Sequence, residues 1–165
     1  MSNIRWMIRR DIPEVLDINT LNDEGNALSE EEFLSLLRER NVICMVVEDQ
    51  DKIVGFMVYE LCPIYLSLLL LQVHPAHKGE GIGAKMFDKL TTKISPTSRR
   101  KFIATQIRES NLDSLLWAKK RGFLAKSINK SAYSSPEDDG IFMIYDGSEE
   151  KGAKVVDFGG IEIEL

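Results

Sequence analysis

Three apolar segments separated by polar breaks predict neighbouring strands in the first half of the chain. Val42 to Glu48 and Ile53 to Leu61 flank Asp49 to Lys52, a polar stretch that indicates a hairpin turn between antiparallel strands. Ile64 to Val73 follows as a third strand. Its run Leu68 to Leu71 lacks polar alternation. Such a run is typical of a central strand, so we expect it to be covered on both faces of the sheet.

Two capping-box patterns predict helices between a short first strand, Ile4 to Ile8, and this hairpin. In such a box, a short polar side chain at the helix start and an acidic side chain three residues later each accept a hydrogen bond from a backbone N–H group. Asp11 with Glu14 forms the first box, and Ser29 with Glu32 forms the second. We therefore expect Asp11 and Ser29 to be the N-cap residues of two helices.

The second half of the chain alternates between helical and strand-like patterns. A helical period begins at Gly81, and another helix is expected from Asn111 to Lys120, with Gly122 as its C-terminal cap. The expected strands are Lys101 to Ile107, Phe123 to Ile128 and Gly140 to Tyr145, with a polar loop, Asn129 to Asp139, between the last two. The resulting order β-α-α-β-β-β-α-β-α-β-β predicts the α/β class with a mixed sheet.

Length and composition predict one globular domain. The 165 residues are 44% hydrophobic and 28% charged, which is typical of a soluble protein of this size. We place the domain at residues 1–146 and a C-terminal extension, either flexible or an added edge strand, at residues 147–165. No apolar run in the chain reaches the roughly 20 residues that span a bilayer, and the N-terminus lacks the apolar core of an export signal. These features predict a cytoplasmic protein without a membrane partner. We expect a monomer or a homodimer, between which no pattern in the sequence decides.

Charge is unevenly distributed along the second half of the chain. Residues 95–130 carry nine Lys/Arg against two Asp/Glu, whereas residues 131–165 carry two against nine. Two interpretations stay open: adjacent elements that pair their solvated faces, or a basic side for an anionic cofactor and an acidic side for a basic peptide. The net charge of −5 argues against general binding of nucleic acid. Cys44 and Cys62 stand in apolar segments and indicate neither a disulfide nor a metal site.

The stretch VHPAHKGEGIGAKM, residues 73–86, contains glycines at positions 79, 81 and 83 just before a helical period. Glycines there let backbone N–H groups approach an anion at the N-terminus of the helix. A P-loop does not fit, because Ala84-Lys85-Met86 lacks the hydroxyl that must follow the lysine. A dinucleotide-binding loop does not fit either, because its third glycine comes one residue later. Another phosphate-bearing ligand is therefore expected.

The surrounding residues resemble the GNAT superfamily of acyl-CoA-dependent N-acyltransferases. A strand ends in Gln72-Val73-His74-Pro75, and Lys78-x-x-Gly81-x-Gly83 follows. The family's pyrophosphate loop reads [Q/R]-x-x-G-x-[G/A] after such a strand end. Asn111 also stands eleven residues before Gly122-Phe123, as in the family's N-x₁₀-G-F helix. The resemblance covers Ile4 to about Tyr145. It departs from the family pattern at Lys78, which stands at the Gln/Arg position: a lysine keeps the positive charge of an arginine but lacks the forked pair of N–H donors.

This resemblance implies acetyl-CoA as the cosubstrate and assigns its binding residues. The pyrophosphate would be bound by the loop residues Lys78, Gly79, Glu80, Gly81, Ile82, Gly83 and Ala84. Unpaired backbone groups of Leu71, Gln72 and Val73 would bind the pantetheine amides in the manner of an added strand. Asn111 would lie beside the pantetheine arm, or would serve only as the N-cap of its helix.

Within the family, three short stretches resemble the ribosomal-protein-alanine (RimI-like) N-acetyltransferases. They are Met7 to Asp11, Val54 to Glu60, and Ala132-Tyr133 followed by acidic residues. This resemblance implies that the acceptor is the N-terminal α-amine of a protein or peptide. Two other interpretations stay open: transfer to a small-molecule amine or a lysine, and a catalytically silent module that binds acyl-CoA.

The catalytic positions of the RimI-like pattern are not matched. That pattern has a glutamate base five residues before the asparagine and a tyrosine acid seven residues after it, where this chain has Gln106 and Ala118. We therefore expect Tyr133 to act as the acid, ahead of Glu109, and Gln106 to position a water molecule. Glu60 and Tyr145 are further candidates. An α-amine has a reference pKa of about 7.7 to 8.0, so a strong base is not obligatory.

Overall fold

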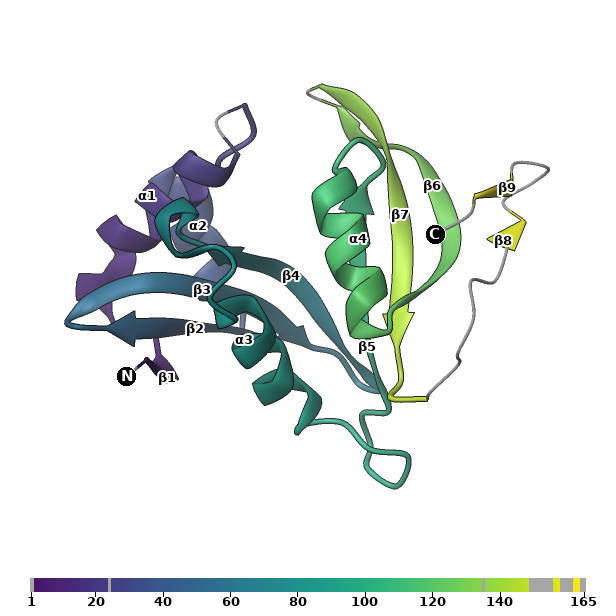
Figure 1. Ribbon diagram of the computed structural model, residues 1–165, viewed down its shortest axis with the longest axis horizontal. Helices are drawn as coiled ribbons and strands as arrows, with labels where there is room; N and C mark the ends of the chain where they lie inside the picture. The colour runs from purple at the N-terminus through teal and green to yellow at the C-terminus, as the bar shows by residue number, and fades with distance from the viewer. Residues whose placement is uncertain (1, 24, 135, 149–155, 158–161, 164–165) are drawn as a thin grey trace. The chain divides into compact units, whose positions relative to one another are not determined.

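The computed structural model describes residues 2–23, 25–134, 136–148, 156–157 and 162–163. Its helices are α1 (Ile12–Asn22), α2 (Glu30–Arg38), α3 (Ile82–Thr91) and α4 (Leu112–Arg121). Its strands are β1 (Asn3–Trp6), β2 (Val42–Asp49), β3 (Lys52–Leu61), β4 (Tyr65–Val73), β5 (Phe102–Arg108), β6 (Leu124–Ser134), β7 (Glu137–Tyr145), β8 (Val156–Asp157) and β9 (Glu162–Ile163). The described strands β1 to β7 follow the order β1-β2-β3-β4-β5-β7-β6 (Figure 1). The predicted α/β class and order of elements through β7 are confirmed.

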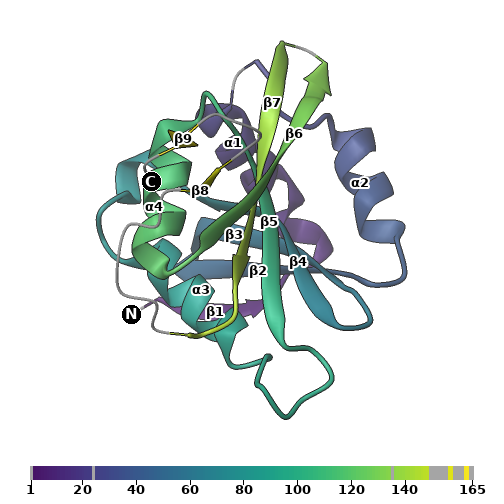
Figure 2. The ribbon, with the colours of Figure 1, turned by 90° about the vertical axis from the view of Figure 1, so that its right-hand side faces the viewer.

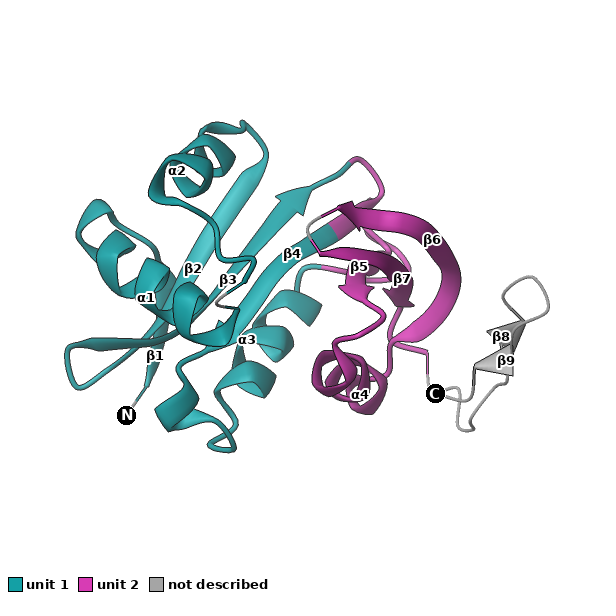
Figure 3. Ribbon diagram, turned by 90° about the horizontal axis from the view of Figure 1, so that it is seen from above, with its two compact units in different colours: residues 1–62, 67–93 teal, residues 63–66, 94–165 magenta. Residues whose placement is uncertain are grey.

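The chain forms two compact units, shown in different colours in Figure 3. The first consists of residues 1–62 and 67–93, and the second of residues 63–66 and 94–165. The first therefore contains β1 to β3, most of β4 and α1 to α3, while the second contains β5 to β7 and α4. A single domain over residues 1–146 stays a prediction. No helix in the described ranges combines the length and hydropathy needed to cross a membrane.

In the first unit, the predicted hairpin is confirmed. β1, β2 and β3 pair in antiparallel fashion, and Asp49 lies opposite Lys52. Gln50 and Asp51 between them have φ angles of 49° and 62°, as a two-residue type I′ turn requires. Such a turn matches the twist of the two strands, so its two polar residues set the register of the hairpin.

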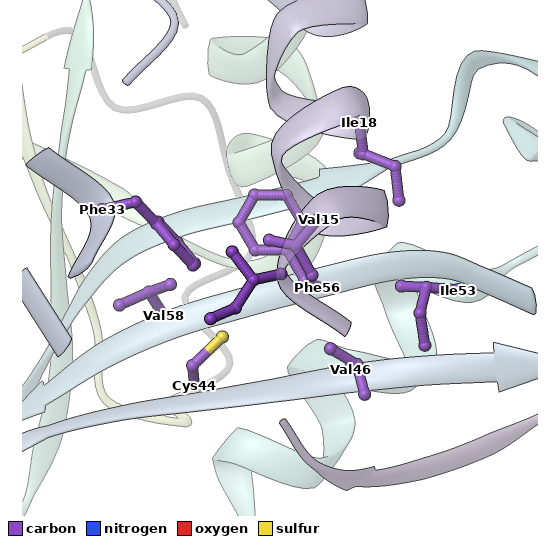
Figure 4. Close-up of a cluster of buried hydrophobic side chains, with 9 residues drawn as sticks. Val15, Ile18, Phe33, Cys44, Val46, Ile53, Phe56 and Val58 are labelled. Atoms are coloured by element: carbon purple, nitrogen blue, oxygen red, sulfur yellow. The ribbon is translucent and has the colours of Figure 1, made fainter. Parts of the chain in front are cut away.

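A hydrophobic cluster lies between this sheet and the helices α1 and α2 (Figure 4). Its buried members are Ile12, Val15, Ile18, Phe33, Cys44, Val46, Ile53, Phe56 and Val58. Side chains on a strand alternate between faces, and a side chain on Gly55 would meet Ile82 and Met86 of α3. Helix α3 therefore covers the face of the sheet opposite to α1 and α2.

The predicted capping boxes have different outcomes. At α2 the box is confirmed, because Ser29 Oγ accepts from the Glu32 N–H at 3.1 Å and the Glu32 carboxylate accepts from the Ser29 N–H at 2.7 Å. At α1 the box is wrong. Asp11 occupies the N-cap position, but its carboxylate accepts from Arg5 at 2.7 and 3.0 Å and from the Ile8 N–H at 2.8 Å. Arg5 outcompetes the helix N–H groups because it offers two charge-assisted hydrogen bonds.

The prediction for the run Leu68 to Leu71 is wrong in part. Leu68 is buried, but the side chain of Leu69 is 39% exposed, so the run is not covered on both faces along its length. The strand therefore keeps a period of two at this point, although the run Leu68 to Leu71 contains no polar residue.

The second unit is built on β5, β7 and β6, in that order, with α4 beside them (Figure 2). The predicted polar loop from Asn129 to Asp139 is wrong, because β6 and β7 continue through most of it as a long hairpin. Polar side chains pair along the hairpin: Lys130 Nζ donates to Asp139 at 2.9 Å, and Ser131 Oγ donates to Glu137 at 3.1 Å. Register shifts between Asn129 and Tyr133 and a φ of 51° at Ser131 hide the strand alternation from the sequence.

Beyond residue 148, the described part of the C-terminal extension is a short antiparallel pair, in which Val156 lies opposite Ile163 and Asp157 opposite Glu162. This pair forms a two-stranded sheet of its own. The rest of the predicted extension beyond residue 148 lies outside the described residues.

Candidate functional site

The glycine loop of the first unit connects the end of β4 to α3. The His74 N–H donates to the Val54 carbonyl at 2.8 Å, and a 3₁₀ turn, Pro75–His77, follows. Gly79 and Gly81 then have φ angles of 85° and 81°. In this left-handed region a side chain is strained. The two glycines therefore set the path by which the loop enters the helix.

The loop presents backbone donors to open space. Gly81 is the N-cap residue of α3 and has no side chain to cap the N–H groups of the first turn, so these donors need another partner. A Cβ atom placed on Gly79 or Gly81 would meet nothing within 4 Å. Unpaired donors at the positive end of a ten-residue helix fit an anionic group such as a pyrophosphate.

A histidine–carboxylate pair lies in the same loop. His77 Nδ1 and Glu80 Oε2 are 3.0 Å apart, and the Glu80 side chain is 54% exposed. Glu80 therefore brings a negative charge next to the proposed anion site, and the contact with His77 fixes the position of its carboxylate. Sequence reasoning included Glu80 among the loop residues and missed this pairing, although the spacing of three residues was a signal for it.

Two amide side chains of α1 reach the end of β4. Asn19 Nδ2 donates to Gln72 Oε1 at 3.0 Å, and Asn22 Nδ2 donates to the Val73 carbonyl at 2.9 Å. The Val73 carbonyl, expected to be available for pantetheine, thus already has a side-chain partner. Both asparagines were missed from the sequence, where they look like ordinary residues near the end of a helix.

A second cluster forms in the second unit around Gln106 of β5. Asn129 Nδ2 donates to Gln106 Oε1 at 3.2 Å, and the Tyr133 hydroxyl donates to the backbone carbonyl of Gln106 at 3.4 Å. A Cβ atom on Gly140 would lie 2.6 Å from Gln106 Cδ. The Gln106 side chain therefore lies directly against Gly140, and only glycine leaves room for it there.

Arg108 lies against Tyr133 in the same cluster. The guanidinium carbon is 4.1 Å from the centre of the Tyr133 ring, within the range of a cation–π interaction. Arg108 Nη1 also donates to the Pro136 carbonyl at 3.1 Å, which ties the tip of the β6–β7 hairpin to β5. Sequence reasoning named Tyr133 and Gln106 and missed Arg108, Asn129 and Gly140.

The other predicted residues of the second unit have separate surroundings. Glu109 is exposed, and its charge adds to the raised pKa of Lys130, which is caused first by the hydrogen bond from Lys130 to Asp139. Asn111 is the N-cap of α4, where Oδ1 accepts from the Ser114 N–H at 3.2 Å. The N-cap interpretation of Asn111 is thus confirmed, and its role beside pantetheine stays a prediction. Ala118 is buried in the core.

The structure therefore brings Gln106 together with Tyr133 in the second unit. In the first unit it brings the end of β4 together with the loop at residues 78–84. The described residues contain no group of three or more His, Cys, Asp or Glu side chains that could hold a metal ion.

The family model of the acetyltransferase (GNAT) family matches residues 6–123, well over half of the chain. The chain belongs to this family. Among curated protein sequences, none matches the chain.

Solved structures of the same fold include a known N-acetyltransferase. The ribosomal-protein-S18-alanine N-acetyltransferase from Escherichia coli has a TM-score of 0.76 at 18% identity, over 92% of this chain and 98% of the other. Ard1 from Thermoplasma volcanium has a TM-score of 0.75 at 21% identity, over 87% and 96%. NAA60 from Arabidopsis thaliana, solved in complex with a bisubstrate analogue, has a TM-score of 0.75 at 12% identity, over 88% and 97%. At these identities the likeness is one of fold.

Proposed function

We propose that this protein transfers the acetyl group of acetyl-CoA to the N-terminal α-amine of a protein or peptide. The observation that carries the proposal is the loop before α3, in which Gly79 and Gly81 hold left-handed angles beside open space. Residues 78–84 would bind the pyrophosphate through backbone N–H groups. Leu71, Gln72 and Val73 would bind the pantetheine arm, as would Asn111 in the second unit.

The choice of an α-amine follows from the chemistry of Gln106. An amide cannot accept the proton of an ammonium group, so the acceptor must lose that proton readily. At pH 7 about a tenth of an α-amine with a pKa near 8 is neutral, compared with well under a thousandth of a lysine with a pKa of about 10.4. A cluster without a carboxylate at position 106 therefore favours a protein N-terminus over a lysine.

In the proposed reaction, the neutral amine attacks the thioester carbonyl, a C–N bond forms and the C–S bond breaks. The amine gives its proton to water positioned by Gln106, and the departing thiolate takes a proton from the Tyr133 hydroxyl. Arg108 against the Tyr133 ring would stabilise the phenolate that results. Glu109 remains the second candidate for the acid. No covalent enzyme intermediate is formed.

A second candidate function is a silent module that binds acyl-CoA without transfer. It is favoured by one observation: the family's expected glutamate and tyrosine positions hold Gln106 and a buried Ala118. Transfer to a small-molecule amine or a lysine is the remaining alternative. We keep a cytoplasmic location, and a monomer or homodimer without nucleic-acid or membrane partners, as part of the proposal.

The experiment measures CoA binding by calorimetry and acetyl-CoA turnover by release of free thiol. The acceptors are a panel of N-terminal peptides, lysine peptides and polyamines. We expect turnover with N-terminal peptides. Binding without turnover on any amine would establish the silent module, and turnover only on lysine or polyamine would establish the other acceptor class. Absence of CoA binding would contradict every form of the proposal.

Two variants test the assigned residues. Gly81→Asp brings a carboxylate to the loop and is expected to abolish CoA binding, whereas Gly81→Asn has the same shape and backbone strain without the charge and is the matched control. Tyr133→Phe is expected to lower kcat at least tenfold. A normal rate in Tyr133→Phe would remove its hydroxyl from the reaction.

A further inference from the structure

Asn19 and Asn22 lie three residues apart on α1 and both donate to the end of β4. Asn19 Nδ2 donates to the Gln72 side chain at 3.0 Å, and Asn22 Nδ2 donates to the Val73 carbonyl at 2.9 Å and to the Ile18 carbonyl at 3.0 Å. Residues three apart face the same side of a helix. The last two residues of β4 are therefore held by two consecutive side chains of one helix face.

Asn19 is only 4% exposed, which is unusual for a polar side chain inside a helix. Its environment demands that both ends of the amide be bonded, because an unbonded buried polar group costs about 1 to 3 kcal/mol. Both ends are bonded: Nδ2 donates to Gln72, and Oδ1 accepts from the Leu28 N–H at 2.8 Å. An apolar residue at this position could fill the same space but could make no hydrogen bond. The role of Asn19 is therefore to orient Gln72 and Leu28 rather than to add hydrophobic packing.

The held residues stand where the chain leaves the sheet for the glycine loop. Val73 is the last residue of β4, and the next residue, His74, donates its N–H to the Val54 carbonyl at 2.8 Å. Asn22 thus holds the chain from the side of α1, and Val54 holds it from β3. Between them these contacts fix the point from which the loop at residues 78–84 starts.

The Leu28 contact adds the segment between α1 and α2 to the same arrangement. Leu28 lies in this connection, just before the N-cap Ser29. Because a single amide of Asn19 binds both Leu28 and Gln72, a displacement of β4 changes the hydrogen bond that holds the connection, and the reverse also holds.

We infer that Asn19 and Asn22 are positioning residues that hold the end of β4 for acyl-CoA, and that Asn19 couples acyl-CoA binding to the segment between α1 and α2. The inference rests on the proposed function, since it assigns these contacts to the acyl-CoA strand. The coupling is reciprocal: binding at β4 restrains the segment, and release of the segment weakens binding at β4.

The test uses Asn22→Ala and Asn19→Ala in the full chain, with Thr20→Ala as the control. Thr20 stands on the same helix and is exposed. We expect each asparagine variant to weaken CoA binding at least fivefold, as the loss of one or more hydrogen bonds to half-buried partners predicts. Thr20→Ala is expected to bind CoA as the wild type does. Asn22 is half-buried, so Asn22→Ala remains informative if Asn19→Ala does not fold.

The second readout is the hydrogen exchange of the Leu28 amide with and without CoA. A purely structural role of Asn19 would not make this exchange depend on CoA. In the wild type we expect CoA to slow this exchange at least threefold. In Asn19→Ala, saturating CoA is expected to protect the amides of residues 82–84 and to leave Leu28 unchanged. Folded asparagine variants that bind CoA like the wild type, or a Leu28 amide unaffected by CoA in the wild type, would overturn the inference. A wild type that binds no CoA would instead contradict the proposed function itself.

Discussion

A methyl group on Gly55 would lie 3.1 Å from the backbone carbonyl oxygen of Gln72. The same methyl group would lie 3.1 Å from Ile82 Cγ2 and 3.2 Å from Met86 Cε, both on α3. Because Gly55 has no side chain, the end of β4 and the first turn of α3 can both pack against β3 at this position. Gln72 lies at the end of β4 and Ile82 belongs to the proposed pyrophosphate loop, so this contact affects the site as well as the core.

Gly55→Ala is expected to destabilise the protein by about 1 to 2 kcal/mol, because a methyl group is forced into a filled space. The backbone carbonyl of Gln72 cannot turn away as a flexible side chain can, so β4 must shift and CoA binding is expected to weaken. Urea unfolding measures the first effect and calorimetry the second. Gly25→Ala is the control, since a Cβ atom there meets nothing within 4 Å. Equal stability and equal affinity in Gly55→Ala would show that the space is not filled.

The sequence does not reveal the role of Gly55 because its contacts come from residues far along the chain. Local patterns predict well where local hydrogen bonds decide the structure, as at the capping box of Ser29 and Glu32. The box at Asp11 has the same pattern, but Arg5 takes its carboxylate. A pattern read over four residues contains no information about such a competitor.

The candidate site shows the same limit. The glycine spacing was sufficient to locate the loop, since left-handed angles at Gly79 and Gly81 are a property of the residues themselves. The cluster around Gln106 depends on the register of β6 and β7, which shifts between Asn129 and Tyr133. Without that register, the contacts of Asn129 and Gly140 with Gln106 could not be predicted.

Gly140→Ala tests whether the placement of Gln106 matters for turnover. The new Cβ atom would lie 2.6 Å from Gln106 Cδ and 2.8 Å from Gln106 Cγ, so the side chain must leave its position. We expect kcat to fall by about as much as in Gln106→Ala, with the affinity for CoA unchanged. The double variant should lose no more than either single variant, because both remove the same interaction. Additive losses would show that Gly140 acts by another route.

Gln106→Glu restores the carboxylate that the family pattern has at this position. The Asn129 amide can donate to a carboxylate oxygen as it does to Gln106 Oε1, so the side chain can keep its place. General base catalysis typically contributes 10²-fold or more, and we expect kcat with an N-terminal peptide to rise at least tenfold. The wild-type rate should fall below the amine pKa of about 8, because only the neutral amine attacks, and in Gln106→Glu this acidic limb should move to lower pH. An unchanged rate would mean that removal of the ammonium proton is not limiting.

Glu80→Gln removes a negative charge from the proposed anion site. A charge near a helix N-terminus typically changes the interaction by a few tenths to about 1 kcal/mol, so CoA affinity is expected to rise about two- to fivefold. The gain should shrink at high salt, because Glu80 is exposed and screened by ions. His77→Ala is the companion variant: it leaves Glu80 unpaired and should weaken CoA binding. Weaker CoA binding in Glu80→Gln, or tighter binding in His77→Ala, would contradict the placement of the anion at this loop.

Asp11→Asn is expected to destabilise the protein by roughly 2 kcal/mol near pH 7, the range for charged hydrogen bonds to a buried group. Asp11 is only 3% exposed, and its pKa is lowered first by the hydrogen bond from Arg5 and then by that from the Ile8 N–H. The more exposed Glu48 also binds Arg5, at 3.0 Å, so Glu48→Gln should have a smaller effect. Urea unfolding of both variants gives the comparison.

The same pair determines how the stability difference depends on pH. A carboxylate whose pKa is lower in the folded state stabilises that state fully above its unfolded pKa, and this contribution is lost as the pH falls through the folded pKa. The difference between wild type and Asp11→Asn should therefore be constant from pH 7 to about 5, because the unfolded pKa is about 3.8. It should decrease as the pH falls below the unfolded pKa, where the unfolded carboxylate takes up a proton, and it is lost once the pH falls through the lower folded pKa. A difference that grows as the pH falls below this value would show that the Arg5–Asp11 pair does not carry the effect.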